Sequence, residues 1–125
     1  MRLLLDTHAL LWWLEDSPEL SADARERIAD GSNEVAVSAA SAWEMAIKRA
    51  AGKLRVPDDL AAAVEASHLM PLPISLEHAF KAGSLPPHHQ DPFDRMLIAQ
   101  ALIEGLTIVT RDARFEPYGV PLLAA

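Results

Sequence analysis

Short apolar runs that end in polar residues recur along the chain, and they constrain its fold more than any other feature. Residues 3–5, 35–37 and 106–109 consist mainly of Leu, Val, Ile and Ala, and a polar side chain directly follows each run. Runs this short and this apolar are typical of strands that are buried on both faces of a sheet. Segments with helical spacing separate them. An alternation of strands and helices predicts an α/β fold with a central parallel β-sheet flanked by α-helices.

The remaining segments fit the same plan as helices and edge strands. Ser, Asp and Pro at helix starts and Gly at helix ends mark the boundaries of the helical segments. The proline-containing segments 70–74 and 120–123 fit edge strands, where a missing N–H is tolerated. No linker or internal repeat interrupts the 125 residues, which predicts a single domain over residues 1–125. The expected helices cover residues 9–14, 21–29, 41–51, 57–67, 75–82 and 92–104.

Residues 88–101 join a polar loop to the most regular helical pattern of the chain. Asp91 precedes Pro92, and an acidic N-cap followed by proline at the first helical position is a strong helix start. Asp94 then falls in the first turn, where the helix dipole tolerates negative charge. It is not needed as a cap and is free for chemistry, although compensation of the dipole would also explain it. The inner face of this helix is expected to carry Phe93, Leu97, Ile98, Ala101 and Leu102, and the outer face Arg95, Gln100 and Glu104.

Four acidic residues occupy equivalent places in this pattern. Asp6 and Asp112 each follow a predicted strand. Glu44 and Asp94 each lie in what we expect to be the first turn of a helix. The carboxyl ends of parallel strands meet at one edge of a sheet, so all four acids are expected there. For Glu44 a capping box with Ser41 is a competing explanation, because a Glu at the third helical position bonds back to the N-cap amide.

The composition limits what these acids can bind. There is no cysteine, so a metal must be held by oxygen or imidazole, which favours a hard cation. Lys and Arg total 11 against 18 Asp and Glu, and the net charge of −7 argues against nucleic-acid binding by bulk electrostatics. No apolar run approaches the roughly 18 residues needed to cross a bilayer. No signal-like segment is present either, so we expect a cytoplasmic protein without a membrane anchor.

Four carboxylates in one place repel one another, so without cations at least one of them is expected to take up a proton. Mg²⁺, with Mn²⁺ as an alternative, prefers oxygen ligands and is commonly shared between protein carboxylates and substrate phosphate. Two such ions roughly 4 Å apart activate a water and stabilise the leaving oxygen of a phosphodiester. Since no Ser, Cys or Lys nucleophile stands out, hydrolysis of a nucleic-acid backbone by water is the simplest reaction. The sequence leaves open whether one or two ions bind.

Basic and aromatic side chains near the acids offer further contacts. Lys48 begins a run of basic residues that follows Glu44, and this run is either a solvated face or a grip for phosphates. Trp12 is expected in the core or an interface rather than stacked on a base. His88 and His89 precede the central helix. Adjacent side chains in an extended loop point apart, so we expect a loop or substrate-contact role rather than a metal pair.

Four motifs stand in order along the chain: Asp6-Thr7-His8, Trp43-Glu44 with Ser38 and Ser41 upstream, His89 to Arg95, and Thr110 to Phe115. Together they resemble the PIN-domain ribonucleases, most closely the VapC toxins of bacterial type II toxin–antitoxin pairs. The resemblance covers essentially the whole chain. It implies that Thr110 supports the metal site, and Arg95 and Arg111 are the other candidates for supporting or substrate contacts. Whether Asp91 also touches metal stays open. The Mg²⁺-binding catalytic quartet implied by the resemblance is Asp6, Glu44, Asp94 and Asp112.

The resemblance also implies a three-layer PIN fold, a homodimer, an RNA substrate and a cognate VapB-like antitoxin whose tail occupies the active-site groove. On the residues alone, two other functions stay open. In a haloacid-dehalogenase-like phosphatase Asp6 would be the nucleophile, but a second aspartate would be needed where His8 stands. In a noncatalytic PIN-like interaction module the acids would serve as caps and the apolar surfaces would bind a partner. A metal-dependence assay on RNA separates the three functions.

Overall fold

A sheet of five parallel strands organises the structure, a computed structural model that describes all of residues 1–125. The strands are β1 (Arg2–Leu5), β2 (Glu34–Ser38), β3 (Met70–Leu72), β4 (Thr107–Thr110) and β5 (Leu122–Ala124). They follow the order β3-β2-β1-β4-β5 across the sheet, so the first strand lies at its centre. Every neighbouring pair is parallel. The predicted parallel sheet is therefore confirmed, and so are both edge strands.

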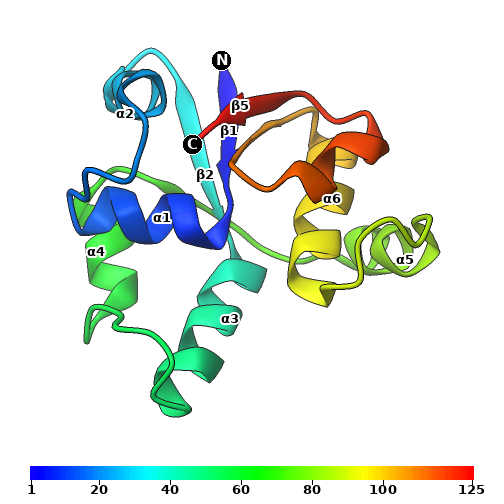
Figure 1. Ribbon diagram of the computed structural model, residues 1–125, viewed down its shortest axis with the longest axis horizontal. Coiled ribbons are helices and arrows are strands. Elements are labelled where there is room, and N and C mark those ends of the chain that lie inside the picture. The colour runs from blue at the N-terminus through cyan, green and yellow to red at the C-terminus, as the bar shows by residue number, and fades with distance from the viewer.

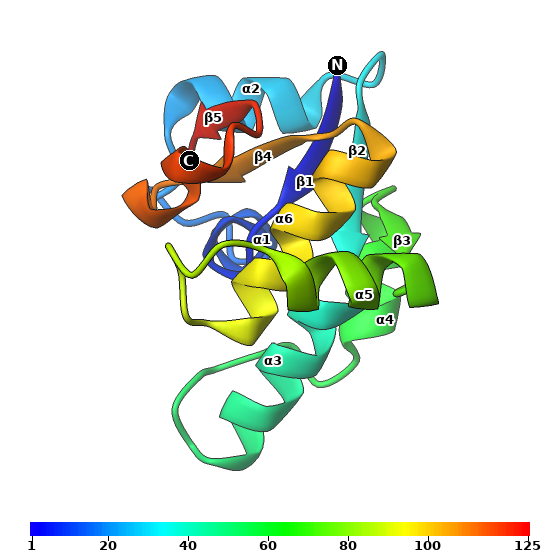
Figure 2. The same ribbon diagram turned by 90° about the vertical axis from the view of Figure 1, so that its right-hand side faces the viewer.

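Helices cover both faces of this sheet and give the fold three layers. They are α1 (Thr7–Leu14), α2 (Ala22–Ala29), α3 (Ala39–Ala50), α4 (Leu60–Ala66), α5 (Leu76–Ser84) and α6 (Pro92–Glu104), with a 3-10 helix η1 (Ala113–Tyr118) after β4. Helices α1, α2 and α4 lie on one side of the strands and α5 and α6 on the other (Figure 1). Figure 2 shows α5 in front of α6 and crossing it on that second side. None of the helices combines the length and apolarity that a membrane crossing requires.

Successive residues of a strand point into different layers, and each layer has its own apolar core. Leu3 and Leu5 belong to the core shared with α1, α2 and α4. Leu4, between them, belongs to the core shared with α5 and α6. All three side chains are fully buried. Because the sheet is covered on both faces, its central strands read as unbroken apolar runs rather than as alternating ones.

The strands that lead to the candidate site pass directly into helices through capping residues. Asp6 follows β1 and accepts a hydrogen bond from the Ala9 N–H, which starts α1 at Thr7, two residues earlier than predicted. Ser38 ends β2 and accepts a bond from the Ala40 N–H, which starts α3. Such oxygen acceptors satisfy N–H groups that have no partner inside the helix. The turns at the carboxyl ends of the strands are therefore short and fixed.

Three predictions about helices are wrong. Leu102, expected on the inner face of α6, is exposed. The helix after β2 begins at Ala39 with Ser38 as its N-cap, so Ser41 and Glu44 do not form a capping box and Glu44 lies in the second turn. Alanine is the best helix former, and the helix begins as soon as the strand ends. Gln100, expected on a solvent-exposed face of α6, is fully buried, and its amide nitrogen lies 3.4 Å from Nδ1 of His78 in α5. The 3-10 helix η1 was not predicted either.

Candidate active site and metal centre

Strands β1 and β4 are neighbours, and both end at the same edge of the sheet. Their register pairs Leu5 with Val109. The Asp6 N–H continues this ladder by donating to the Val109 carbonyl at 3.1 Å. Asp6 therefore lies next to Thr110, the last residue of β4, at the carboxyl edge where ligands bind in parallel sheets.

The Asp6 carboxylate is buried, and both of its oxygens accept hydrogen bonds. Oδ1 accepts the backbone N–H of Ala9 at 2.7 Å, and Oδ2 accepts the Thr110 hydroxyl at 2.6 Å. The Thr110 hydroxyl oxygen accepts the N–H of Asp112 at 3.1 Å, so one side chain links two of the predicted acids. Burial raises the pKa of Asp6, while the bonds from Thr110 and Ala9 favour the ionised form and oppose this rise.

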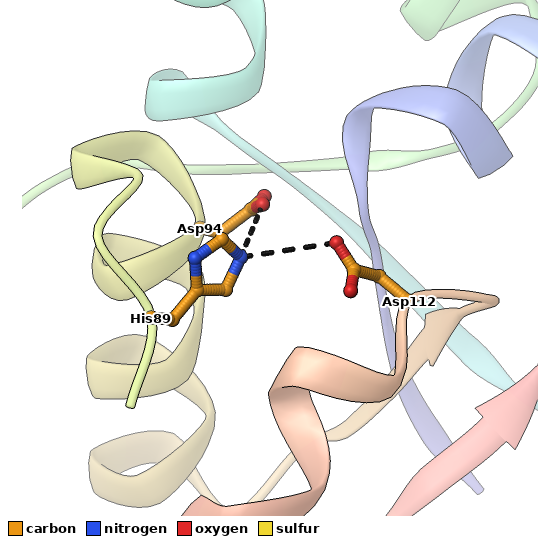
Figure 3. A group of neighbouring side chains, drawn as sticks. All are labelled: His89, Asp94 and Asp112. Atoms are coloured by element: carbon orange, nitrogen blue, oxygen red, sulfur yellow. Dashed lines mark hydrogen bonds and ion pairs between the residues drawn. The ribbon is translucent and has the colours of Figure 1, made fainter. Parts of the chain in front are cut away.

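Asp94 and Asp112 approach each other beside the ring of His89 (Figure 3). Asp94 comes from the first turn of α6, and Asp112 follows β4. His89 Nε2 lies 2.9 Å from Asp94 Oδ2 and 3.8 Å from Asp112 Oδ2. One ligand atom from each of the three residues lies within 4.8 Å of the others. This spacing is compatible with one shared metal ion.

Negative charge is crowded around Asp94. Burial is the largest cause that raises its pKa, to about 7, and repulsion from Asp91, Asp6, Glu44 and Asp112 adds to the rise. The other three predicted acids therefore all repel the charge on Asp94. A carboxyl group in this state holds a proton near neutral pH unless a cation compensates the charge. This agrees with the expectation that at least one acid of the quartet is protonated in the absence of metal.

Asp91 is the N-cap of α6, as predicted. Its Oδ1 accepts the N–H of Phe93 at 2.8 Å and the N–H of Asp94 at 3.1 Å. Pro92 occupies the first helical position, where no N–H is required. The cap thus uses the Asp91 carboxylate, while the Asp94 carboxylate is directed to His89. The two acids of this motif have different hydrogen-bond partners and different local tasks.

Glu44 is buried, and its carboxylate is already paired within the chain. Oε1 accepts the Thr7 hydroxyl at 2.5 Å, and Oε2 accepts the Lys48 ammonium at 2.6 Å. The bond to Glu44 is the main cause that raises the pKa of Lys48, and Asp91 and Asp94 contribute less. Glu44 therefore repels the charge on Asp94 while its own charge is paired with Lys48, one helical turn away.

Asp112 is paired with a cation as well. The Arg114 guanidinium donates to Asp112 Oδ1 from Nε at 3.0 Å and to Oδ2 from Nη2 at 2.6 Å. The bond to the Arg114 side chain is the main cause that lowers the pKa of Asp112. Asp112 and Asp94 are thus neighbours whose pKa values shift in opposite directions. Asp112 stays ionised at pH values where Asp94 holds its proton.

Arg95 binds backbone carbonyls, so the prediction that it points toward water is wrong. Its guanidinium lies against the segment that precedes α6 and holds that segment in place. Without the Arg95 guanidinium, the four carbonyls that it binds would need hydrogen bonds from water. With its donors engaged in this way, Arg95 supports the loop before the site and is poorly placed to bind substrate. The carbonyls belong to Ala82 (2.9 Å), Leu85 (2.8 Å), Pro86 (3.0 Å) and His89 (3.2 Å).

Arg111 lies on the outer side of the site and keeps half of its side chain exposed. Its guanidinium stacks over the Trp12 ring at 4.4 Å from the ring centroid. Nη2 donates to the Ala125 carbonyl at 3.1 Å and also to the Glu19 carbonyl. Trp12 is thus half-buried and packed against a cation rather than fully in the core. The exposed edge of Arg111 faces solution beside Asp112.

The sequence did not predict the roles of His89 and Tyr118 at the site. Both His88 and His89 were expected to have a loop or substrate-contact role, yet His88 is exposed and His89 is buried. The signal that distinguishes them is position: His89 is the second residue before the Asp91 cap, where the chain folds back over the first turn of the helix. Tyr118 belongs to the unpredicted η1, and its hydroxyl accepts the His89 N–H at 2.8 Å.

The donor set suits a hard metal ion. Asp94 and Asp112 supply carboxylate oxygens, which are the ligands that Mg²⁺ and Mn²⁺ prefer, whereas Asp6 and Glu44 lie outside the group whose ligand atoms are all within 4.8 Å of one another. Besides burial, the neighbouring negative charges raise the pKa of Asp94, and a bound cation would neutralise those charges. Glu44 and Asp112 are each neutralised by a cation of the chain, whereas Asp94 has no such partner among the lysines and arginines. The acidic cluster can therefore bind a metal ion.

Comparisons with known proteins agree with this geometry. The PIN domain family model matches residues 3–120. The chain is 30% identical over 122 residues to ribonuclease VapC22 of Mycobacterium tuberculosis (strain ATCC 25618 / H37Rv), covering 95% of this chain and 93% of that relative. Solved structures with the same fold include DNA-bound VapBC from Salmonella typhimurium, with a TM-score of 0.72 and 24% identity over 98% of this chain and 97% of that one. VapBC2 from Rickettsia felis, bound to a promoter DNA fragment, also has a TM-score of 0.72, with 19% identity over 98% of both chains. The chain belongs to the PIN domain family, within its VapC-type group.

Proposed function

We propose that the chain is a Mg²⁺-dependent endoribonuclease that hydrolyses RNA phosphodiester bonds. The observation that carries this proposal is the partly buried Asp94 carboxylate, whose negative charge is repelled by four neighbouring acids. A carboxylate with a purely structural role would cap a helix, as Asp91 does, or pair with a lysine or arginine. Asp94 does neither: its side-chain partner is His89, and the relative VapC22 is named a ribonuclease. This argues against a noncatalytic module, in which the cluster would have no task.

Asp6, Asp94 and Asp112 are the residues that would hold Mg²⁺, or Mn²⁺ as the alternative, with Glu44 completing the catalytic quartet. When bound, the ion supplies a Lewis acid that lowers the pKa of a coordinated water and neutralises charge on the phosphate. The chain's own contribution is to hold the ligands. Thr110 fixes one oxygen of Asp6, and the α1 N-terminus fixes the other. These fixed ligands reduce the reorganisation needed when substrate binds.

Basic side chains at the rim would position the RNA backbone. Lys48, with about a third of its side chain exposed, and Arg114, with about two thirds exposed, stand beside the acids of the site. Ammonium and guanidinium groups bind phosphate oxygens strongly. The hydroxyls of Thr7 and Thr110 both donate to carboxylates, which leaves water as the nucleophile. The proposed reaction is therefore attack of water on a phosphodiester held between basic side chains.

We further propose that this ribonuclease is the toxin of a type II toxin–antitoxin pair. The similar solved structures carry the names of VapBC complexes, which contain two kinds of chain. A cognate VapB-like antitoxin would inhibit the enzyme by placing an arginine among Asp6, Asp94 and Asp112, where the crowded carboxylates favour a cation. The family resemblance also supports a homodimer. In this proposal the antitoxin and the metal ion compete for the same acids.

The ribonuclease proposal is tested with purified protein and a mixed-sequence RNA. We expect cleavage with Mg²⁺ or Mn²⁺, none in EDTA, and none for Asp94→Asn. A phosphatase would instead release phosphate from an aryl phosphate ester and leave RNA intact. Absence of RNA cleavage by folded protein with either metal would overturn the proposal.

The toxin proposal has a separate test in growing cells. Expression of the chain alone should slow growth, expression of Asp94→Asn should not, and co-expression of the small protein encoded beside it should restore growth. If the active enzyme is harmless at high expression, or if that neighbour does not inhibit cleavage in a purified assay, the toxin proposal fails while the ribonuclease proposal stands.

A further inference from the structure

The imidazole of His89 lies at the centre of the acidic cluster but has no part in the reaction described so far. Its side chain is only 1% exposed. Nε2 is 2.9 Å from Asp94 Oδ2, and the ring meets the Phe115 ring edge-on at a centroid distance of 5.7 Å. Figure 3 shows the ring between the chain of its own loop and the two carboxylates. A buried polar ring at this place requires a partner for each nitrogen.

The position of the ring is fixed from three directions. The His89 backbone N–H donates to the Tyr118 hydroxyl at 2.8 Å, and that hydroxyl donates to the Pro86 carbonyl at 2.6 Å. The His89 carbonyl accepts a bond from Arg95 at 3.2 Å. The ring itself packs on Phe115. The imidazole is therefore held in a single orientation by groups outside the acidic cluster.

The hydrogen bonds assign the tautomer of the neutral ring. Nδ1 lies 3.3 Å from the backbone nitrogen of Asp91, whose N–H can only donate, so Nδ1 carries no proton. The single N–H of neutral imidazole is then at Nε2, where it points at Asp94 Oδ2. A histidine that ligates a metal through Nε2 must present a lone pair there. The hydrogen-bonded ring presents a proton instead, so the spacing of His89, Asp94 and Asp112 alone does not make His89 a ligand.

We propose that His89 is a positioning residue of the metal site: it donates from Nε2 to Oδ2 of Asp94 and fixes that carboxylate, leaving Oδ1 for the cation. The inference rests on the proposed metal-dependent function. It inverts the common arrangement in which a carboxylate orients a metal-binding histidine, but the physical effect is the same, because a ligand held in one rotamer binds with less loss of freedom. His89 touches neither metal nor RNA in this role and acts through its hydrogen bond to Asp94, since Asp112 Oδ2, at 3.8 Å from Nε2, lies beyond hydrogen-bond distance.

The first test is made on the metal-free protein by ¹⁵N NMR of the histidine rings. We expect His89 to show a protonated Nε2 and an unprotonated Nδ1, and to keep this pattern when Mg²⁺ is added. A protonated Nδ1 in the metal-free protein, or loss of the Nε2 proton on addition of Mg²⁺, would overturn the proposal. The metal-free measurement does not depend on any enzymatic activity, so its outcome is separate from that of the ribonuclease proposal.

The second test compares Mg²⁺ affinity, measured by calorimetry, in two variants. His89→Leu removes the donor, and we expect the dissociation constant to rise at least roughly tenfold, as for other residues that orient ligands. His89→Gln keeps an N–H donor at a similar reach, and we expect it to recover most of the affinity. Equal affinity in wild type and His89→Leu would overturn the proposal, and so would a loss in His89→Gln as large as that in His89→Leu.

A control separates positioning from stability. His68 lies far from the site in an exposed turn with φ 57°, and His68→Asn removes an imidazole while tolerating that backbone. We expect wild-type Mg²⁺ affinity for this variant. If His89→Leu fails to fold, the comparison of His89→Gln with wild type and the NMR pattern still decide the question. If folded wild type binds no Mg²⁺, both the metal-dependent function and this role fail, whatever tautomer the ring has.

Discussion

Thr110 donates a hydrogen bond of 2.6 Å to Asp6 across 104 residues of sequence. The bond joins the last residue of β4 to the first residue after β1, and the parallel register of these strands sets its length. The donor is buried together with its acceptor, so water does not replace it. The geometry of the first acid of the site is thus fixed by the pairing of strands at the centre of the sheet.

Thr110→Val is expected to destabilise the metal-free protein by about 1–3 kcal/mol, because an isosteric methyl leaves a buried carboxylate oxygen without its donor. The loss of this donor should also raise the pKa of Asp6 further. Urea unfolding in EDTA measures the stability. Thr110→Ser keeps the hydroxyl and should lose less. Equal stability of the Val variant and wild type would show that the bond contributes nothing.

The pKa of Asp94, about 7 against an ordinary 3.8, makes the stability of the metal-free protein depend on pH. The folded state holds this proton more tightly than the unfolded state, so its contribution is complete below pH 4 and is lost as the pH rises through about 7. Asp94→Asn removes the titration. We expect its stability relative to wild type to rise between pH 4 and 7, by up to about 4 kcal/mol. A difference that does not vary with pH in urea unfolding would contradict the assigned pKa.

Asp6→Asn and Asp94→Asn are each expected to abolish Mg²⁺-dependent RNA cleavage while the protein stays folded. Each substitution removes a charged ligand without changing the volume of the side chain. Circular dichroism checks the fold, and gel analysis of RNA products measures the activity. Wild-type turnover by either variant at saturating Mg²⁺ would remove that residue from the quartet.

Asp91→Asn is expected to retain much of the activity, because Asn accepts the same hydrogen bonds from the start of α6. Asp91→Ala should cost about 1 kcal/mol of stability as a lost cap. Activity assays and thermal unfolding of the two variants separate the cap from the chemistry. An inactive Asp91→Asn alongside an active Asp94→Asn would assign the metal-binding role to Asp91.

Arg95→Lys is expected to destabilise the protein by about 2 kcal/mol, because one ammonium group cannot reach the four carbonyls that the guanidinium binds. Arg55→Lys is the matched control on an exposed side chain and should stay within about 0.5 kcal/mol of wild type. Thermal unfolding compares the two. If Arg95→Lys is as stable as wild type but binds RNA more weakly, Arg95 contacts the substrate after all.

The sheet and the start of α6 were predictable from sequence because their signals are local. Double burial leaves unbroken apolar runs, and an Asp-Pro pair marks a helix start whatever surrounds it. The errors concern residues whose surroundings come from distant segments. Gln100 is buried because α5 folds against α6, and Arg95 turns inward because carbonyls of the preceding loop converge on it. The spacing of apolar residues within α6 predicts neither of these contacts.

Because β1 is the central strand and pairs with β4, the site is assembled from residues far apart in the chain, such as Asp6 and Thr110, which are 104 residues apart. Asp6 is synthesised before its partner strand β4 and before Thr110 and Asp112, which follow it by more than 100 residues. A nascent chain that stops before β4 has no second edge on which to hold Asp6, and it lacks one acid of the quartet entirely. Translation itself therefore delays the assembly of the proposed nuclease site, and a product truncated before β4 lacks that site.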